Sequence, residues 1–155
     1  MGLDDIRRRI AAAEERAGRA PGSVTLIAVS KVQPEGRVTA VLDAGHRVFG
    51  ENYVQEAQGK WPGWRDRWPG VELHMIGPLQ SNKARAAVDL FDAIHTLDRM
   101  TLARKLAPQI AQKGRGPRLL SRSTPGTSRK RPGFSRTNCR SSCPPAATWA
   151  CRPRA

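Results

Sequence analysis

The sequence predicts an α/β fold built around a parallel β-sheet. Short runs of apolar residues, typical of strands buried on both faces, alternate with longer segments whose apolar residues recur at helical spacing. Strands separated by helices of this length indicate βα units, which form either a barrel or a doubly wound sheet. A complete barrel needs roughly 200 residues or more. The 155 residues of this chain could therefore supply only about half of one.

The first elements have the clearest signals. Apolar residues at helical spacing predict an amphipathic helix over residues 3–18. VTLIAVSK, residues 24–31, is nearly all apolar and is bounded by turn residues, which predicts a buried strand. Pro34 then opens a second helix, and Gly45 is placed as its C-terminal stop.

The same alternation continues along the chain. Further strands are predicted at residues 47–50, 71–77 and 92–98, and a fifth from Pro117. Further helices are predicted from residue 51, from residue 79 and over residues 99–113. WPGWRDRWPG, residues 61–70, is predicted to be a surface loop, and its three tryptophans are interpreted as cover for a helix end.

The formal net charge of +14 is unevenly distributed. Residues 1–113 hold 17 Lys and Arg against all 13 Asp and Glu, a net charge of +4, while residues 114–155 hold ten basic residues and no acidic ones. The first segment therefore reads as an ordinary, mildly basic domain. The N-terminus has charges throughout and no signal-peptide apolar region, and no apolar run reaches membrane-spanning length. We expect a cytoplasmic protein that does not contact membranes.

Functional groups in parallel βα folds gather at the C-terminal ends of the strands. Lys31 ends the first predicted strand, where partial desolvation would favour its neutral amine. A neutral amine can form a Schiff base with an aldehyde such as pyridoxal phosphate. The alternative is a lysine whose stem covers the sheet end while its ammonium stays in water. From position alone, both interpretations stay open.

Three further candidates lie in or after the next strands. Asn52 could hydrogen-bond a ring substituent of a ligand, or it could cap a helix. His74 is a weaker candidate, because a lone histidine in a strand is usually a core residue with satisfied hydrogen bonds. The triplet at residues 81–83, SNK, could bind a phosphate or an acidic partner, although a solvated first helical turn is the simpler interpretation.

Four sequence blocks resemble the pyridoxal phosphate homeostasis protein family. LIAVSK, AGHRVFGENYVQE, LHMIGPLQSNK and FDAIHTLDR occur in the family's order and spacing, from the first helix to about Leu120. The resemblance implies the N-terminal half of a (β/α)8 TIM-type barrel, like the N-terminal domain of alanine racemase. It also implies pyridoxal 5′-phosphate bound as a Schiff base on Lys31, with Asn52 beside it.

The family is regarded as cofactor carriers or regulators in intracellular homeostasis, so we expect no enzyme activity and a monomeric protein. Racemase activity is not expected, because the only tyrosine is Tyr53 and a racemase takes its second base from a tyrosine in a further domain. The family's phosphate-binding blocks belong to later strands and do not occur in this sequence. We therefore expect the chain to be poorly stable and to bind the cofactor weakly or not at all.

The segment after Leu120 departs from the family. There the fifth strand continues in a segment like LLIEVNTGxExQKxG, whereas this chain has LLSRSTPGTSRKRPG. Codons for these residues can be chosen so that the neighbouring frame reads IEVNTGNEPQKAG. We therefore divide the chain into a barrel segment, residues 1–120, and a basic, disordered, out-of-frame tail, residues 121–155. Resequencing the codons for Leu119 to Thr124 tests this frame-shift hypothesis.

The tail has two other interpretations. A basic nucleic-acid-binding arm is the alternative function, because ten cations without acids bind phosphates in a salt-dependent way. The tail has few aromatic residues to stack bases, so no specific nucleic-acid partner is expected. The three cysteines, Cys139, Cys143 and Cys151, match no common zinc spacing, so no metal is expected.

Overall fold

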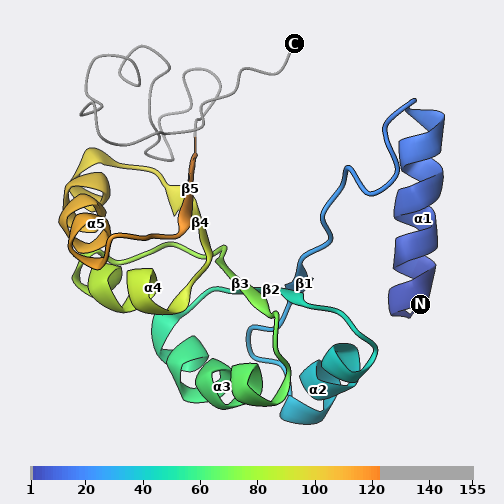
Figure 1. The fold of residues 1–155 in the computed structure, drawn as a ribbon, viewed down its shortest axis with the longest axis horizontal. Coiled ribbons are helices and arrows are strands. Elements are labelled where there is room, and N and C mark those ends of the chain that lie inside the picture. Colours follow the sequence, from blue (N-terminus) through green and yellow to red (C-terminus); the bar gives the residue numbers. More distant parts are fainter. Residues whose placement is uncertain (1, 123–155) are drawn as a thin grey trace.

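A computed structural model describes residues 2–122 of the chain, and the predictions for residues 123–155 lie outside them. Helices and strands alternate as the sequence predicts (Figure 1). The helices are α1 (Leu3–Arg16), α2 (Glu35–Asp43), α3 (Val54–Arg67), α4 (Ala84–Leu90) and α5 (Met100–Lys113), with a short 3₁₀ turn, η1 (Ser81–Lys83), before α4. The strands are β1 (Ala28–Val29), β2 (Val48–Glu51), β3 (Glu72–Met75), β4 (Ala93–Leu97) and β5 (Arg118–Ser121).

The strands form one five-stranded parallel sheet in the order β1-β2-β3-β4-β5. Each strand therefore pairs with the one before it in the chain. Doubly wound sheets reverse direction at a switch point, and the five described strands contain no such reversal. The α/β class with a parallel sheet is confirmed.

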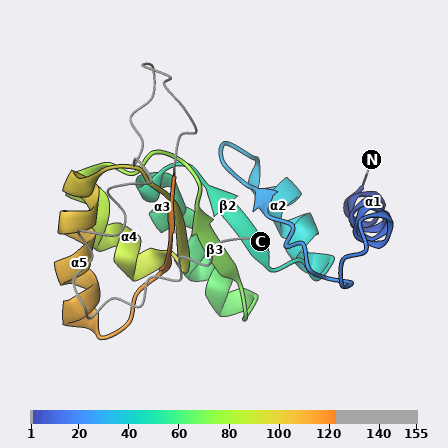
Figure 2. The ribbon, with the colours of Figure 1, turned by 90° about the horizontal axis from the view of Figure 1, so that it is seen from above.

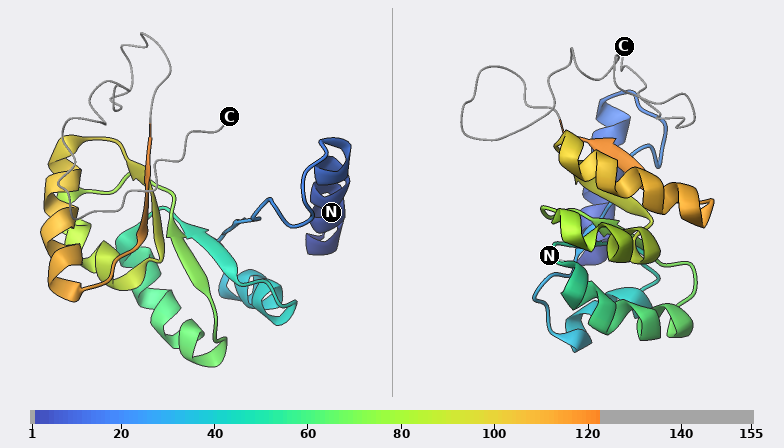
Figure 3. Two further views of the ribbon diagram at one scale, coloured as in Figure 1. Left: turned by 45° about the horizontal axis from the view of Figure 1, so that its top comes forward. Right: turned by 90° about the vertical axis from the view of Figure 1, so that its left-hand side faces the viewer.

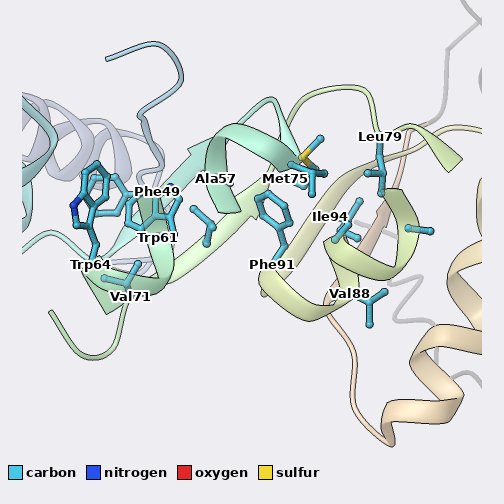
Figure 4. Packing of buried hydrophobic residues seen from close by; sticks show 14 of the residues in the cluster. Phe49, Ala57, Trp61, Trp64, Val71, Met75, Leu79, Val88, Phe91 and Ile94 are labelled. Atoms are coloured by element: carbon cyan, nitrogen blue, oxygen red, sulfur yellow. The ribbon is translucent and has the colours of Figure 1, made fainter. Parts of the chain in front are cut away.

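Helices α2 to α5 all lie on one face of this sheet (Figures 1 and 3). The hydrophobic core fills the space between the sheet and these helices, with Phe49, Met75 and Ile94 pointing toward the helices (Figure 4). Side chains alternate along a strand, so the neighbours of these residues in each strand point to the opposite face of the sheet. Val29 and Leu120 lie on that opposite face and are 49% and 43% exposed.

Helix α1 stands away from the sheet, joined to β1 by an extended segment (Figures 1 and 2). The carboxylate of Glu14 organises the turn that follows the helix. It accepts hydrogen bonds from the amides of Gly22 (3.0 Å) and Val24 (2.6 Å) and from the hydroxyl of Ser23 (3.1 Å). The direction in which the chain leaves α1 is thus set by local hydrogen bonds.

The prediction of a surface loop at residues 61–70 was wrong for residues 61–67, while residues 68–70 form a bend and turn. Helix α3 continues to Arg67 and includes Pro62. Trp61, Trp64 and Trp68 are at most 9% exposed and lie in the core. Trp61 and Trp64 lie one turn apart on the same face of the helix, and Trp68 directly follows the last helical residue. A proline inside a helix costs about 3 kcal/mol, and the burial of three indoles outweighs that cost.

The first strand was also predicted too long. Only Ala28–Val29 pairs with β2, whereas residues 24–31 were expected. β1 lies at the edge of the described sheet, so only one side of it has a strand to pair with. The helix predicted from residue 79 begins later, as the 3₁₀ turn η1 at Ser81 followed by α4 at Ala84. The other boundaries agree with the predictions to within about three residues.

Candidate functional site

Lys31 and Asn52 come together at the C-terminal ends of β1 and β2. The two strands are parallel and in register, with Val29 opposite Gly50, so the residues that follow them leave the same edge of the sheet. Lys31 is exposed and Asn52 is half-buried. Within residues 2–122, neither side chain takes part in a hydrogen bond or ion pair. Both polar groups are therefore available to a ligand.

The backbone around Lys31 forms a tight turn. The amide of Gln33 donates to the carbonyl oxygen of Ser30 at 3.2 Å, which places Lys31 and Val32 at the two central positions. Val32 has a φ of 55° and is the only non-glycine residue among the described residues with positive φ. A β-branched residue in this region is strained, at a cost of about 1–3 kcal/mol, and such strain clusters at functional sites.

A hydrogen bond from the next helix supports this strained turn. The amide of Val32 donates to Oε1 of Glu56 on α3 at 2.7 Å, and the same carboxylate pairs with Lys60. The hydrogen bond from Lys60, together with that from the Val32 amide, holds the pKa of Glu56 below its ordinary value. Glu56 is therefore a charged acceptor at neutral pH.

Glu51 lies beside the same turn and is fully buried. Its Oε1 accepts hydrogen bonds from the hydroxyl of Ser30 (2.8 Å) and from the indole of Trp61 (3.1 Å), while Oε2 has no partner. Burial raises the pKa of Glu51, so the neutral acid is favoured compared with an exposed glutamate. Sequence reasoning did not foresee this role, although Ser30 and Glu51 directly precede Lys31 and Asn52 in the chain.

Asn52 is held against the loop that follows β3. A Cβ built on Gly77 would lie 2.5 Å from the carbonyl oxygen of Asn52. Only glycine allows this close approach of two backbones. Helix α3 has Tyr53 as its N-cap and no side-chain cap hydrogen bond, so the helix-cap alternative for Asn52 is not observed.

His74 lies within β3 rather than after it. It is opposite Gly50 in the register, below the sheet edge that carries Lys31, and is 3% exposed. Its Nδ1 lies 3.0 Å from Nε2 of His95, a residue not singled out from the sequence, and its Nε2 lies 3.2 Å from Glu72. Glu72 in turn pairs with Arg118. Among residues 2–122, the polar contacts of His74 are thus to His95 and Glu72 rather than to Lys31 or Asn52, and its role in cofactor binding stays a prediction.

His95 is expected to make stability depend on pH. Burial, with the nearby His74 and Arg118, holds the pKa of His95 below its ordinary value. The unfolded chain therefore binds a proton at this residue more readily, starting at about pH 6.5. We expect the free energy of unfolding to fall as pH drops from 7.5 to 5.5. The His95→Gln variant, compared by urea titration at both pH values, should show a smaller fall.

A matched control is His46→Gln. The pKa of His46 is also lowered by burial, but this residue contacts the backbone of Val48 rather than another histidine. The His46→Gln variant should lose the contribution of His46 to the pH dependence of stability and keep the contribution of His95. An identical pH dependence in the parent and in His95→Gln would contradict the prediction.

The loops after β3 and β4 are tied to each other rather than open. The hydroxyl of Thr96 donates to the carbonyl oxygen of Gly77 at 2.6 Å. The guanidinium of Arg99 donates to the carbonyl oxygen of Leu79, also at 2.6 Å. Residues 81–83 form the 3₁₀ turn η1, in agreement with the simpler interpretation of a first helical turn. No group of three or more potential metal ligands occurs among residues 2–122. No helix in that part of the chain is long and apolar enough to cross a membrane.

Curated relatives share the name of the family suggested by the sequence blocks. The chain is 46% identical over 108 residues to the pyridoxal phosphate homeostasis protein of Escherichia coli K12, which covers 69% of this chain and 46% of that protein. It is 43% identical over 104 residues to the protein of the same name from Pseudomonas aeruginosa PAO1, covering 67% and 44%. The chain thus spans about half the length of the curated relatives it matches. No family model matches the chain.

The chain is also similar to solved structures. PipY of Synechococcus elongatus PCC7942 without PLP (pyridoxal 5′-phosphate) superposes with a TM-score of 0.68 at 39% identity, over 84% of this chain and 59% of PipY. The structure of PipY with PLP bound gives 0.61 at 43% identity, over 74% and 52%.

Proposed function

We propose, on the confirmed relationship of this chain to the pyridoxal phosphate homeostasis protein family, that it binds pyridoxal 5′-phosphate through Lys31. The observation that carries the proposal is the strained turn that presents Lys31 beside Asn52 at one edge of the sheet. A related protein, PipY, has been solved with PLP bound. Intracellular PLP homeostasis is the role this supports, without an enzymatic reaction.

The residues present fit an aldehyde cofactor. The Lys31 side chain is exposed and forms no ion pair within residues 2–122, so its amine can reach a ligand. That nitrogen would bond the aldehyde carbon as a Schiff base, with the release of one water. Asn52 offers an unpaired amide that can donate to and accept from a ring substituent.

The proposal extends to the architecture. The five consecutive parallel strands are the first strands of a (β/α)8 barrel, with helices α2 to α5 on its outer side. Sequential strand order without reversal supports this interpretation. Residues 1–120 would form the barrel segment and residues 121–155 the out-of-frame tail. We further propose a monomeric, cytoplasmic protein without membrane or specific nucleic-acid partners.

The test is reductive trapping. The purified 155-residue chain is mixed with PLP over a concentration series, reduced with borohydride and analysed by peptide mass spectrometry. We expect a stable label at Lys31 and its loss in Lys31→Ala. Lys83→Ala is the matched control, because Lys83 follows another strand of the same sheet and should leave the Lys31 label unchanged.

Labelling spread evenly over all lysines would contradict a specific site at Lys31. A DNA-binding measurement on the same purified chain tests the nucleic-acid alternative. If the chain instead retains DNA in a salt-sensitive way, and deletion of residues 121–155 abolishes retention, the basic arm is the functional element.

A further inference from the structure

Each chain neighbour of Lys31 is held by a different carboxyl group. On one side, the hydroxyl of Ser30 donates to Glu51 at 2.8 Å. On the other, the amide of Val32 donates to Glu56 at 2.7 Å. Both acceptors belong to the following βα unit, Glu51 at the end of β2 and Glu56 in the first turn of α3. The backbone of Lys31 is thus anchored on both sides, while its side chain is exposed and unpaired within residues 2–122.

The first anchor is rigid. Glu51 is completely buried, and Trp61 from α3 donates to the same oxygen that accepts from Ser30. The backbone carbonyl of Glu51 also accepts the amide of Ile76 at 2.9 Å, which binds it to the loop after β3. Ser30 is itself 2% exposed and donates its amide to Gly50 at 3.0 Å. The Ser30 end of the turn can therefore shift only if β2 shifts with it.

The second anchor acts on a strained residue. Val32 occupies the third position of the turn, where positive φ usually requires glycine. Its side chain is 77% exposed, so packing does not hold it there. The hydrogen bond to Glu56 is the specific contact that offsets the strain, and Lys60 holds the Glu56 carboxylate in place from the next turn of the helix.

We propose that Glu51 and Glu56 are positioning residues that fix the direction of the Lys31 side chain through Ser30 and Val32. The inference rests on the proposed function, since the direction of Lys31 matters because its amine takes the cofactor. Each carboxyl acts as a hydrogen-bond acceptor. A glutamine at either position keeps an acceptor oxygen, whereas an alanine does not.

The experiment compares Glu56→Ala with Glu56→Gln in the full chain. The loss of one hydrogen bond corresponds to about a 3- to 10-fold change, so we expect Glu56→Ala to need about that much more PLP for half-maximal labelling of Lys31. Glu56→Gln should stay within about twofold of the parent because its amide oxygen still accepts from Val32. Glu15→Ala is the matched control, an exposed glutamate in α1.

A second pair of variants addresses the buried anchor. Ser30→Ala removes the hydroxyl that donates to Glu51 at 2.8 Å and that also lies 3.3 Å from the carbonyl oxygen of Gly50, and it should weaken labelling to a similar extent. Glu51→Gln keeps an oxygen for both Ser30 and Trp61 and should retain most of the labelling. Far-ultraviolet circular dichroism identifies any variant that fails to fold. In that case the remaining variants decide the outcome.

A cofactor-free measurement separates this inference from the proposed function. Amide hydrogen exchange at Val32, followed by NMR without PLP, should be faster in Glu56→Ala than in the parent and in Glu56→Gln. If the parent chain is not labelled by PLP, the proposed function fails, and this exchange rate alone decides whether Glu56 anchors the turn. Unchanged exchange, unchanged labelling in Glu56→Ala, or an equal loss in Glu56→Gln would each overturn the proposal.

Discussion

Replacement of Trp61 by alanine is expected to lower the free energy of unfolding by about 3–5 kcal/mol, the range for truncation of a large buried aromatic residue. Trp61 is completely buried on α3, between Phe49 of β2 and Trp64 one turn further along the helix (Figure 4). Its ring centroid lies 5.0 Å from that of Phe49 and 5.1 Å from that of Trp64. The variant would leave a cavity where the helix meets the sheet.

The same substitution also removes a hydrogen bond. The indole of Trp61 donates to Glu51, so its loss leaves a buried carboxyl with one donor fewer. The two effects act in the same direction. Because small domains are stable by only about 5–15 kcal/mol, the variant should lose a large part of its free energy of unfolding and unfold at a much lower urea concentration.

Urea denaturation followed by circular dichroism measures the effect. Tyr53→Ala is the matched control, since Tyr53 directly precedes α3 and is 56% exposed. Surface substitutions of this kind change stability by less than about 0.5 kcal/mol. If Trp61→Ala and Tyr53→Ala had similar midpoints, the tryptophan would not be part of the core and the assignment of α3 would be wrong.

The tryptophan segment also shows where sequence reasoning about the fold fails. Two Pro-Gly pairs among residues 61–70 carry strong local turn signals, and those signals predicted a loop. The decisive factor is tertiary packing, because the helix that continues past Pro62 carries Trp64 into the core and ends next to the buried Trp68. By contrast, helix α5 was predicted correctly despite Pro108, because its apolar residues keep helical spacing throughout.

The candidate site was predictable in part, for a physical reason. Lys31 and Asn52 follow consecutive parallel strands, and parallel strands deliver their C-terminal ends to one edge of the sheet. Glu56 had no such signal, because a glutamate in the first turn of a helix is usually a solvated residue. The contact between His74 and His95 depends on the register between β3 and β4, which the sequence alone does not determine.

Substitution of Gly77 by alanine is the second change expected to have a large effect, because it tests the fold and the site together. The new Cβ would lie 2.5 Å from the carbonyl oxygen, 2.6 Å from the Cα and 2.8 Å from the Cβ of Asn52. Two of these atoms are backbone and cannot rotate away. Either the loop after β2 or the loop after β3 must move, at a cost of about 1–3 kcal/mol for such overpacking.

The direction of that movement matters for the site. The loop after β3 is fixed by the hydrogen bond from Thr96 to the carbonyl oxygen of Gly77. The Asn52 side chain, by contrast, forms no hydrogen bond within residues 2–122. We therefore expect Asn52 to be displaced, so that Gly77→Ala weakens reductive labelling of Lys31 by PLP as well as lowering the urea midpoint.

Gly59→Ala provides a control with the opposite sign. Gly59 lies inside helix α3, and a Cβ added there would meet no neighbouring side chain within 4 Å, so alanine should stabilise the protein by about 0.5–1 kcal/mol. A general effect of adding a methyl group cannot destabilise at one site and stabilise at the other. If Gly77→Ala unfolded at the parent's urea concentration, the close approach between the two loops would be refuted. Asn52 would then not owe its position to Gly77.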